Sequence, residues 1–122
     1  MTAKYFTEKE FCCSHCGQLP SAGMDKKLIA VLDRAREMIG APIHVTSGYR
    51  CKTQNSAVGG ASRSYHMMGN AADVYSDRVD VYELKSILRA AMEAENVEGG
   101  LQEYPVQEFV HVDTRGYWAS WC

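Results

Sequence analysis

Three polar residues occupy positions where the hydrophobic pattern predicts burial or near-burial: His66, Asp73 and His111. A buried carboxylate is costly unless it is paired or bound to a metal ion. Two imidazoles and one carboxylate form a common ligand set for catalytic zinc, in which the fourth position stays open for water. Gly69 lies between the first two residues, and a glycine tolerates the positive φ that a chain reversal requires. On this pattern alone, the three residues predict either a metal site or histidines packed in the core.

A second group of metal-type side chains lies near the N-terminus. The chain has five cysteines, and three of them crowd into residues 12–16 together with His15. A Cys-x2-Cys pair is half of a structural zinc site, and in a reducing compartment such clusters bind metal more often than they oxidise. The alternatives are a disulfide to Cys51 and thiols packed beside a turn. The residues of the second, structural metal site would be Cys12, Cys13, Cys16 and Cys51.

Two helices and several short strands must position these groups. Apolar residues at spacings of three and four predict an amphipathic helix over 25–39. Asp80 and Glu83 have capping-box spacing at the start of a second helix that runs to about residue 96. Short segments of strand character are found at 43–46, 71–75, 101–104 and 109–113. The sequence predicts a small α+β domain, with two main helices packed on one antiparallel sheet.

Residues 51–70 differ from the rest of the chain. They are rich in small and turn-forming residues and show no clean period, so we expect a loop of about twenty residues. A long ordered loop in a small domain tends to carry function, and this loop contains Asn55, Ser64 and His66.

Composition limits the class of protein. The chain has 122 residues, of which 46% are hydrophobic and 23% charged, with a net charge of −2. These values predict one globular domain over 1–122, with the cysteine-containing residues 1–24 packed on it. We expect no nucleic-acid binding, because basic character is absent, and no membrane insertion, because no apolar run approaches ~18 residues. The start of the chain shows no readable signal peptide, so we expect synthesis in the cytoplasm.

The residues around His66 resemble a known family. Residues 64–73 match the SxHxxGxAxD motif of the M15 family of zinc D,D-peptidases at every fixed position. Residues 45–60 and 104–121 look like the blocks that flank this motif in the family. The start of the chain is similar to that of a compact branch found in many phage and bacterial genomes. The resemblance covers nearly the whole chain and implies a fold like those of Hedgehog and the D-Ala-D-Ala peptidases.

The resemblance implies roles for individual residues. The family's zinc ligands align with His66, Asp73 and His111, so Zn²⁺ is the expected cofactor. Arg50 aligns with an arginine that holds the scissile carbonyl or a substrate carboxylate, and Ser64 with a substrate-contacting hydroxyl. Asn55, in the same loop as Ser64, could add one hydrogen-bond donor.

Two residues are candidates for the general base. Related enzymes carry an acidic residue three positions before the second histidine, which is Glu108 here, although Val110 replaces the family's tryptophan. Because Glu108 and His111 are an odd number of residues apart, a regular strand points them to opposite faces. Glu108 therefore reaches a metal only if the chain bends before Phe109. Asp113 lies on the same face of the strand as His111. It is the substitute general base, or else a partner that orients His111.

The activity that the resemblance implies is hydrolysis of D-amino-acid-containing peptide bonds in peptidoglycan, with a zinc-bound water as the nucleophile. The resemblance leaves open whether the enzyme is a D,D-carboxypeptidase or an L-Ala-D-Glu endopeptidase of the endolysin type. The expected partners are peptidoglycan stem peptides, and we expect the protein to be a monomer. It would act at the cell wall, which a phage enzyme would reach through a holin. One alternative is a non-catalytic zinc-containing module of the same fold that binds the cell wall or a partner. Another is a cysteine peptidase that uses Cys51 with a histidine.

Overall fold

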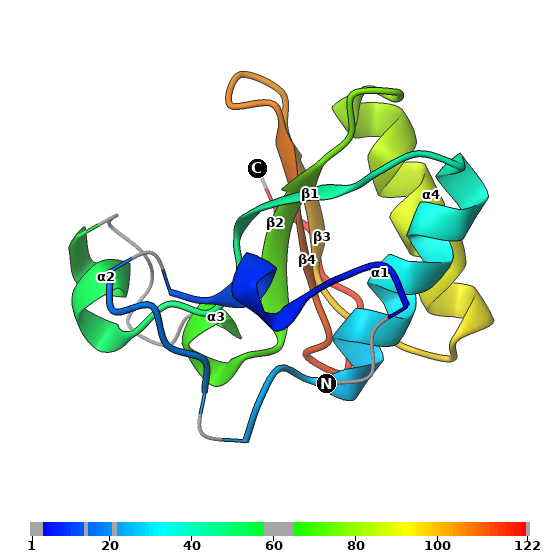
Figure 1. Ribbon diagram of the computed structural model, residues 1–122. Coiled ribbons are helices and arrows are strands. Elements are labelled where there is room, and N and C mark those ends of the chain that lie inside the picture. Colours follow the sequence, from blue (N-terminus) through cyan, green and yellow to red (C-terminus); the bar gives the residue numbers. More distant parts are fainter. Residues whose placement is uncertain (1–3, 14, 21, 58–64, 122) are drawn as a thin grey trace.

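A four-stranded antiparallel sheet with strand order β1-β2-β4-β3 forms the centre of the molecule (Figure 1). The computed structural model describes residues 4–13, 15–20, 22–57 and 65–121. Its strands are β1 His44–Ser47, β2 Ala71–Tyr75, β3 Leu101–Tyr104 and β4 Phe109–Asp113. Its helices are the 3-10 helix Glu8–Phe11, α1 Lys26–Ile39, α2 Lys52–Ala57, α3 Tyr65–Met68 and α4 Val81–Ala94.

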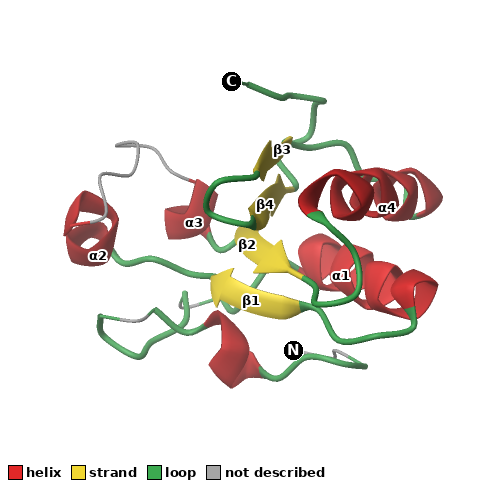
Figure 2. Cartoon of the chain, turned by 90° about the horizontal axis from the view of Figure 1, so that it is seen from above, coloured by secondary structure: helices red, strands yellow, loops and turns green. Residues whose placement is uncertain are grey.

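The two long helices lie side by side on one face of the sheet, while α2 and α3 lie on the opposite side (Figure 1, Figure 2). Alternation along the strands explains the apolar layer between helices and sheet, because every second side chain points the same way. Val74, Val110 and Val112 are fully buried and share one hydrophobic core with Leu84 and Leu88 of α4. The prediction of an α+β domain with two helices on an antiparallel sheet is confirmed. Within the described residues, no helix is both long and apolar enough to cross a membrane.

The other face of the two central strands carries polar residues. The register of β2 and β4 pairs Asp73 with His111 and Ala71 with Asp113. Partners in an antiparallel pair project to the same side, so both carboxylates and the imidazole share the face away from α1 and α4. The fold therefore places the candidate chemistry on the open face and the valines under the helices.

Residues 51–70 contain α2 and α3 in place of the continuous loop that we expected, and that expectation was wrong. The two helices have six and four residues, too few to show the apolar period that reveals a helix in sequence. Residues 58–64 between them lie outside the described residues. The second long helix also ends earlier than expected, at Ala94, since Asn96 takes a positive φ of 56°.

The N-terminal segment packs against β1 and the turn that follows it. Phe11 is fully buried, and the Tyr49 N–H donates to the Phe11 carbonyl at 2.8 Å. A Cβ at Gly48 would lie 2.7 Å from the Phe11 Cα, so only glycine allows this approach. The contact brings the cysteine-containing segment next to residues 48–51.

Candidate active site

The structure brings together His66 from α3, Asp73 from β2 and His111 from β4. The Oδ1 atom of Asp73 lies 3.2 Å from Nε2 of His66 and 3.2 Å from Nδ1 of His111. One donor atom from each residue lies within 4.8 Å of the other two, and the three side chains are almost completely buried. Each residue comes from a different element, so the tertiary fold makes this group.

Hydrogen bonds fix the orientation of both imidazoles. Nδ1 of His66 lies 2.8 Å from the carbonyl oxygen of Gly48, and Nε2 of His111 lies 2.7 Å from Oδ2 of Asp113. Carbonyl and carboxylate oxygens only accept, so these two nitrogens carry the hydrogens. The remaining nitrogen of each ring then turns its lone pair toward Asp73. Metal-binding histidines are held in this way, and two imidazole nitrogens with a carboxylate oxygen fit Zn²⁺.

The charges of the group favour a bound cation. Burial raises the pKa of Asp73, but the neighbouring imidazoles of His111 and His66 outweigh burial and hold that pKa at about 2. Burial lowers the pKa of His111, yet Asp113 and Asp73 on either side of the ring raise it above its usual value. Two ionised carboxylates thus enclose one imidazole, an environment that stabilises a positive charge.

Asp113 has the contacts of an orienting residue. Its side chain is fully buried and accepts from the Gly100 N–H at 2.8 Å, from the Arg115 guanidinium at 2.7 and 3.0 Å, and from His111. Burial raises its pKa, but these donors together hold the pKa well below its usual range. A carboxylate so firmly ionised is a poor acceptor for a proton in catalysis.

Arg50 lies beside the three-residue group. Its backbone N–H donates to the His66 carbonyl at 3.1 Å, and its Nη2 is 3.8 Å from Oδ2 of Asp73. The side chain is 14% exposed, and Nη1 donates to Oδ1 of the buried Asn55 at 3.2 Å. Among the described residues, the buried Nε of Arg50 has no hydrogen-bond partner. Ser64 lies outside the described residues.

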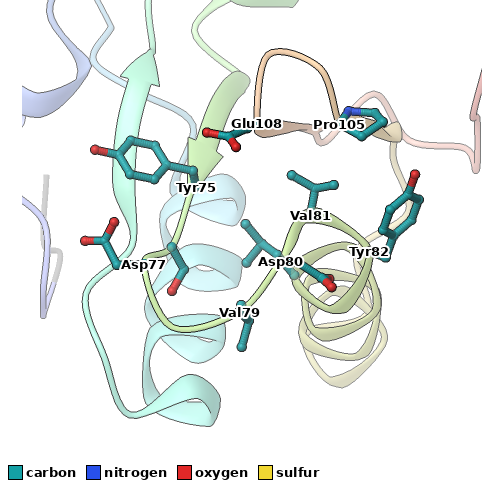
Figure 3. Close-up of a pocket in the computed structure, with 10 residues that line it drawn as sticks. Tyr75, Asp77, Val79, Asp80, Val81, Tyr82, Pro105 and Glu108 are labelled. Carbon is teal, nitrogen blue, oxygen red and sulfur yellow. The ribbon is translucent and has the colours of Figure 1, made fainter.

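Glu108 lies apart from the group. It is exposed, in the turn between β3 and β4, with a positive φ of 62°. Figure 3 shows its side chain beside Tyr75 and across from Val81, on the wall of a cavity of about 380 Å³ that none of the three candidate ligands lines. Glu108 lies three positions before His111, on the order of 10 Å along a strand. The structure therefore does not bring this candidate base to the predicted ligands.

Comparison with known proteins identifies the family. The model of the family Peptidase M15 matches residues 4–113. The chain belongs to this family. It is 33% identical over 98 residues to "Peptidoglycan L,D-endopeptidase MepK" of Escherichia coli (strain K12), which covers 75% of this chain and 51% of that protein. It is 36% identical over 80 residues to "Probable peptidoglycan L,D-endopeptidase MepK" of Haemophilus influenzae, covering 61% and 40%. The chain spans about half the length of the curated relatives it matches.

A solved structure shows the same fold. The L-Ala D-Glu endopeptidase ChiX of Serratia marcescens superposes with a TM-score of 0.59, over 76% of this chain and 81% of that chain. The sequence identity between them is 19%, so the likeness concerns the fold alone.

Aromatic side chains border the His66–Asp73–His111 group. Two of the residues involved, Arg115 and Trp121, follow the segment that matches the M15 family. The Trp121 ring meets His111 edge-on, with centroids 5.2 Å apart, and its Nε1–H donates to the Tyr104 hydroxyl at 2.6 Å. Arg115 stacks on Trp121 and on Tyr65, 5.0 and 4.5 Å from the ring centroids. No spacing rule links residue 121 to His111.

We predict that Asp113→Asn weakens zinc binding by about 10- to 100-fold, the usual cost of losing a partner that orients a metal-binding histidine. The affinity is measured by competition with a chromogenic chelator, and circular dichroism checks that the variant is folded. Asp77→Asn is the matched control, since Asp77 also pairs with a histidine, His44, at 3.1 Å. Equal zinc affinities for wild type and Asp113→Asn would contradict the orienting role.

Proposed function

We propose that this chain is a zinc-dependent endopeptidase that hydrolyses a bond between an L- and a D-amino acid in peptidoglycan stem peptides. The observation that carries the proposal is the convergence of His66 Nε2, Asp73 Oδ1 and His111 Nδ1. Membership of the peptidase M15 family supports peptide hydrolysis and implies zinc. The names of the two curated relatives support the peptidoglycan substrate and favour an endopeptidase over a D,D-carboxypeptidase. The place of action would then be the cell wall.

His66, Asp73 and His111 would hold the zinc ion. When bound, zinc polarises a carbonyl and makes water nucleophilic near neutral pH. The Gly48 carbonyl and the Asp113 carboxylate accept hydrogen bonds from the N–H groups of the two imidazoles. The other nitrogen of each ring therefore stays available to bind the metal. The buried position of all three side chains limits competition from solvent.

Arg50 is proposed to bind the carbonyl oxygen of the scissile bond as negative charge develops on it. The guanidinium lies at the edge of the ligand group and stays charged at any working pH. Asn55 accepts a hydrogen bond from Nη1, which fixes the plane of the guanidinium and makes Asn55 a positioning residue. Ser64 keeps its proposed role as a substrate-contacting hydroxyl from its place in the family motif.

The base that accepts a proton from the attacking water is proposed to be Glu108. The contacts of Asp113 with His111 and Arg115 favour an orienting role for that carboxylate, which leaves Glu108 as the acid at the family's spacing. The Glu108 side chain is exposed and free to move. To act as the base, it must be carried past Phe109 toward the ligands by a rearrangement of the turn. Catalytic contacts often tighten only when substrate is bound.

The central test uses purified peptidoglycan and isolated stem peptides with zinc-loaded protein, with products identified by mass spectrometry. We expect release of the stem peptide from its first alanine, loss of this product with a chelator, and its return with zinc. His66→Ala should abolish the product, whereas His44→Ala, which replaces a half-buried histidine paired with Asp77, should retain it. Loss of a single terminal alanine would instead indicate a D,D-carboxypeptidase. Absence of any chelator-sensitive product would favour the non-catalytic binding module.

Replacement of Arg50 tests the stabilisation of developing charge. Arg50→Ala is expected to lower kcat by about 10²- to 10³-fold with little change in KM, as for loss of one donor to a developing oxyanion. Steady-state kinetics on a stem peptide provide both constants. Arg78→Ala removes an exposed arginine and is the control. A rise in KM with unchanged kcat would show that Arg50 binds the ground state only.

Replacement of Glu108 tests the general base. Glu108→Gln keeps the size of the side chain but removes the proton acceptor, so kcat is expected to fall by about 10²- to 10⁴-fold. Zinc content should not change, because Glu108 is not one of the proposed ligands. Glu93→Gln on α4 is the control, an exposed glutamate paired with Arg89. A kcat within a factor of about two of wild type would remove Glu108 from the mechanism.

A further inference from the structure

Three cysteines from two distant parts of the chain meet beside the candidate active site. The Sγ atoms of Cys13, Cys16 and Cys51 all lie within 4.8 Å of one another, and those of Cys13 and Cys51 are 3.6 Å apart. Cys13 is buried and Cys51 is half-buried. Cys12 points elsewhere, with its thiol directed to the Glu8 carbonyl at 3.6 Å. The fold thus selects three of the four cysteines that the sequence grouped.

The spacing of the sulfur atoms suits a shared metal ion. Zinc–thiolate bonds of ~2.3 Å in a tetrahedron place two sulfurs about 3.8 Å apart. The Cys13–Cys51 separation of 3.6 Å is close to this edge. A disulfide would join only two of the three sulfurs, and it would not explain why the third cysteine lies in the same cluster. Soft thiolate ligands in this number favour zinc over magnesium or calcium.

The backbone around the cysteines supports the thiolate form. Gly17 takes a φ of +69°, and its N–H donates to the Cys13 carbonyl at 2.7 Å, which closes a tight turn around Cys16. The backbone N–H of Cys51 points at Cys13 Sγ at 3.4 Å, and that of Gln54 at Cys51 Sγ at 3.4 Å. N–H groups aimed at sulfur stabilise its negative charge.

We propose that Cys13, Cys16 and Cys51 bind a second, structural zinc ion. Cys16 is exposed, so the fourth ligand position faces solvent, where water would complete the tetrahedron. This site shares no residue with the His66–Asp73–His111 group, and the proposal does not depend on the chain being a peptidase.

The ion would tie the N-terminal segment to the active-site turn. Cys51 directly follows Arg50, whose guanidinium lies 3.8 Å from Asp73. The same turn supplies the Gly48 carbonyl that orients His66, and Tyr49 already bonds to Phe11. A zinc ion shared by Cys13 and Cys51 would add a cross-link to this contact and limit movement of Arg50.

Cobalt substitution of the reduced, metal-depleted full chain tests the proposal. Thiolate-bound Co²⁺ gives intense charge-transfer absorption in the near ultraviolet, which a site of nitrogen and oxygen ligands lacks. We expect two Co²⁺ ions per wild-type chain and this absorption. Cys16→Ser should lose one ion and the absorption. Cys12→Ser, the matched control, should keep both ions and the absorption.

A second pair of measurements separates this site from the proposed active site. The double variant His66→Ala and Asp73→Ala should lose one Co²⁺ ion but keep the thiolate absorption, even where all peptidase activity is absent. In the wild-type chain, zinc should protect the thiols of Cys13, Cys16 and Cys51 from alkylation, and a chelator should expose them. Absence of thiolate absorption in the reduced wild-type chain would overturn the proposal. A Cys13–Cys51 disulfide in protein purified with zinc would also overturn it.

Discussion

Asp73 stands directly opposite His111 in the antiparallel pair of β2 and β4, and the arrangement of the site depends on this register. A slip of one residue would turn one of the two strands over, because successive side chains point to opposite faces. The valines of that strand, Val74 in β2 or Val110 and Val112 in β4, would then face solvent, and its polar residues would face the helices. Burial of the valines under α1 and α4 therefore fixes the position of the candidate ligands on the open face.

A hydrogen-bond acceptor then holds each imidazole in its metal-binding orientation. Asp113 can support His111 because the Gly100 N–H and Arg115 satisfy the rest of its oxygens. A Cβ at Gly100 would lie 2.5 Å from Oδ2 of Asp113, so this carboxylate needs a glycine beside it. Buried carboxylates without such donors would be costly, and their desolvation would favour the protonated form. The hydrogen bonds thus keep the site negatively charged and suited to a cation.

The turn over 48–51 connects the two groups of metal-type residues. It gives the Gly48 carbonyl to His66, Arg50 to the edge of the ligand group, and Cys51 to the cysteine cluster. The glycine at position 48 also lets the N-terminal segment approach, as the contact with Phe11 requires. The match to the M15 family extends over residues 4–113 and includes both groups. Trp121 and Arg115, which border the ligand group, lie beyond it.

The sequence by itself determined the elements with a clear period and the residue types of the candidate metal site. The long helices could be predicted because each buries one continuous apolar face and Asp80 caps the second one. His66 and Asp73 could be singled out because their spacing lies within one short motif. The short helices α2 and α3 could not be predicted, since their stability comes from tertiary packing and not from a local pattern.

Only the tertiary structure decided which distant residues meet. Cys13 and Cys51 are 38 positions apart, and the packing of Phe11 on the Gly48 turn brings their sulfur atoms together while leaving Cys12 outside. The same holds for the contacts of Asp113 with Gly100 and for the distance of Glu108 from the ligands. Local sequence fixes which chemical groups are present and which face of an element they occupy. Their distances and partners depend on how strands pair and loops pack, which no local pattern encodes.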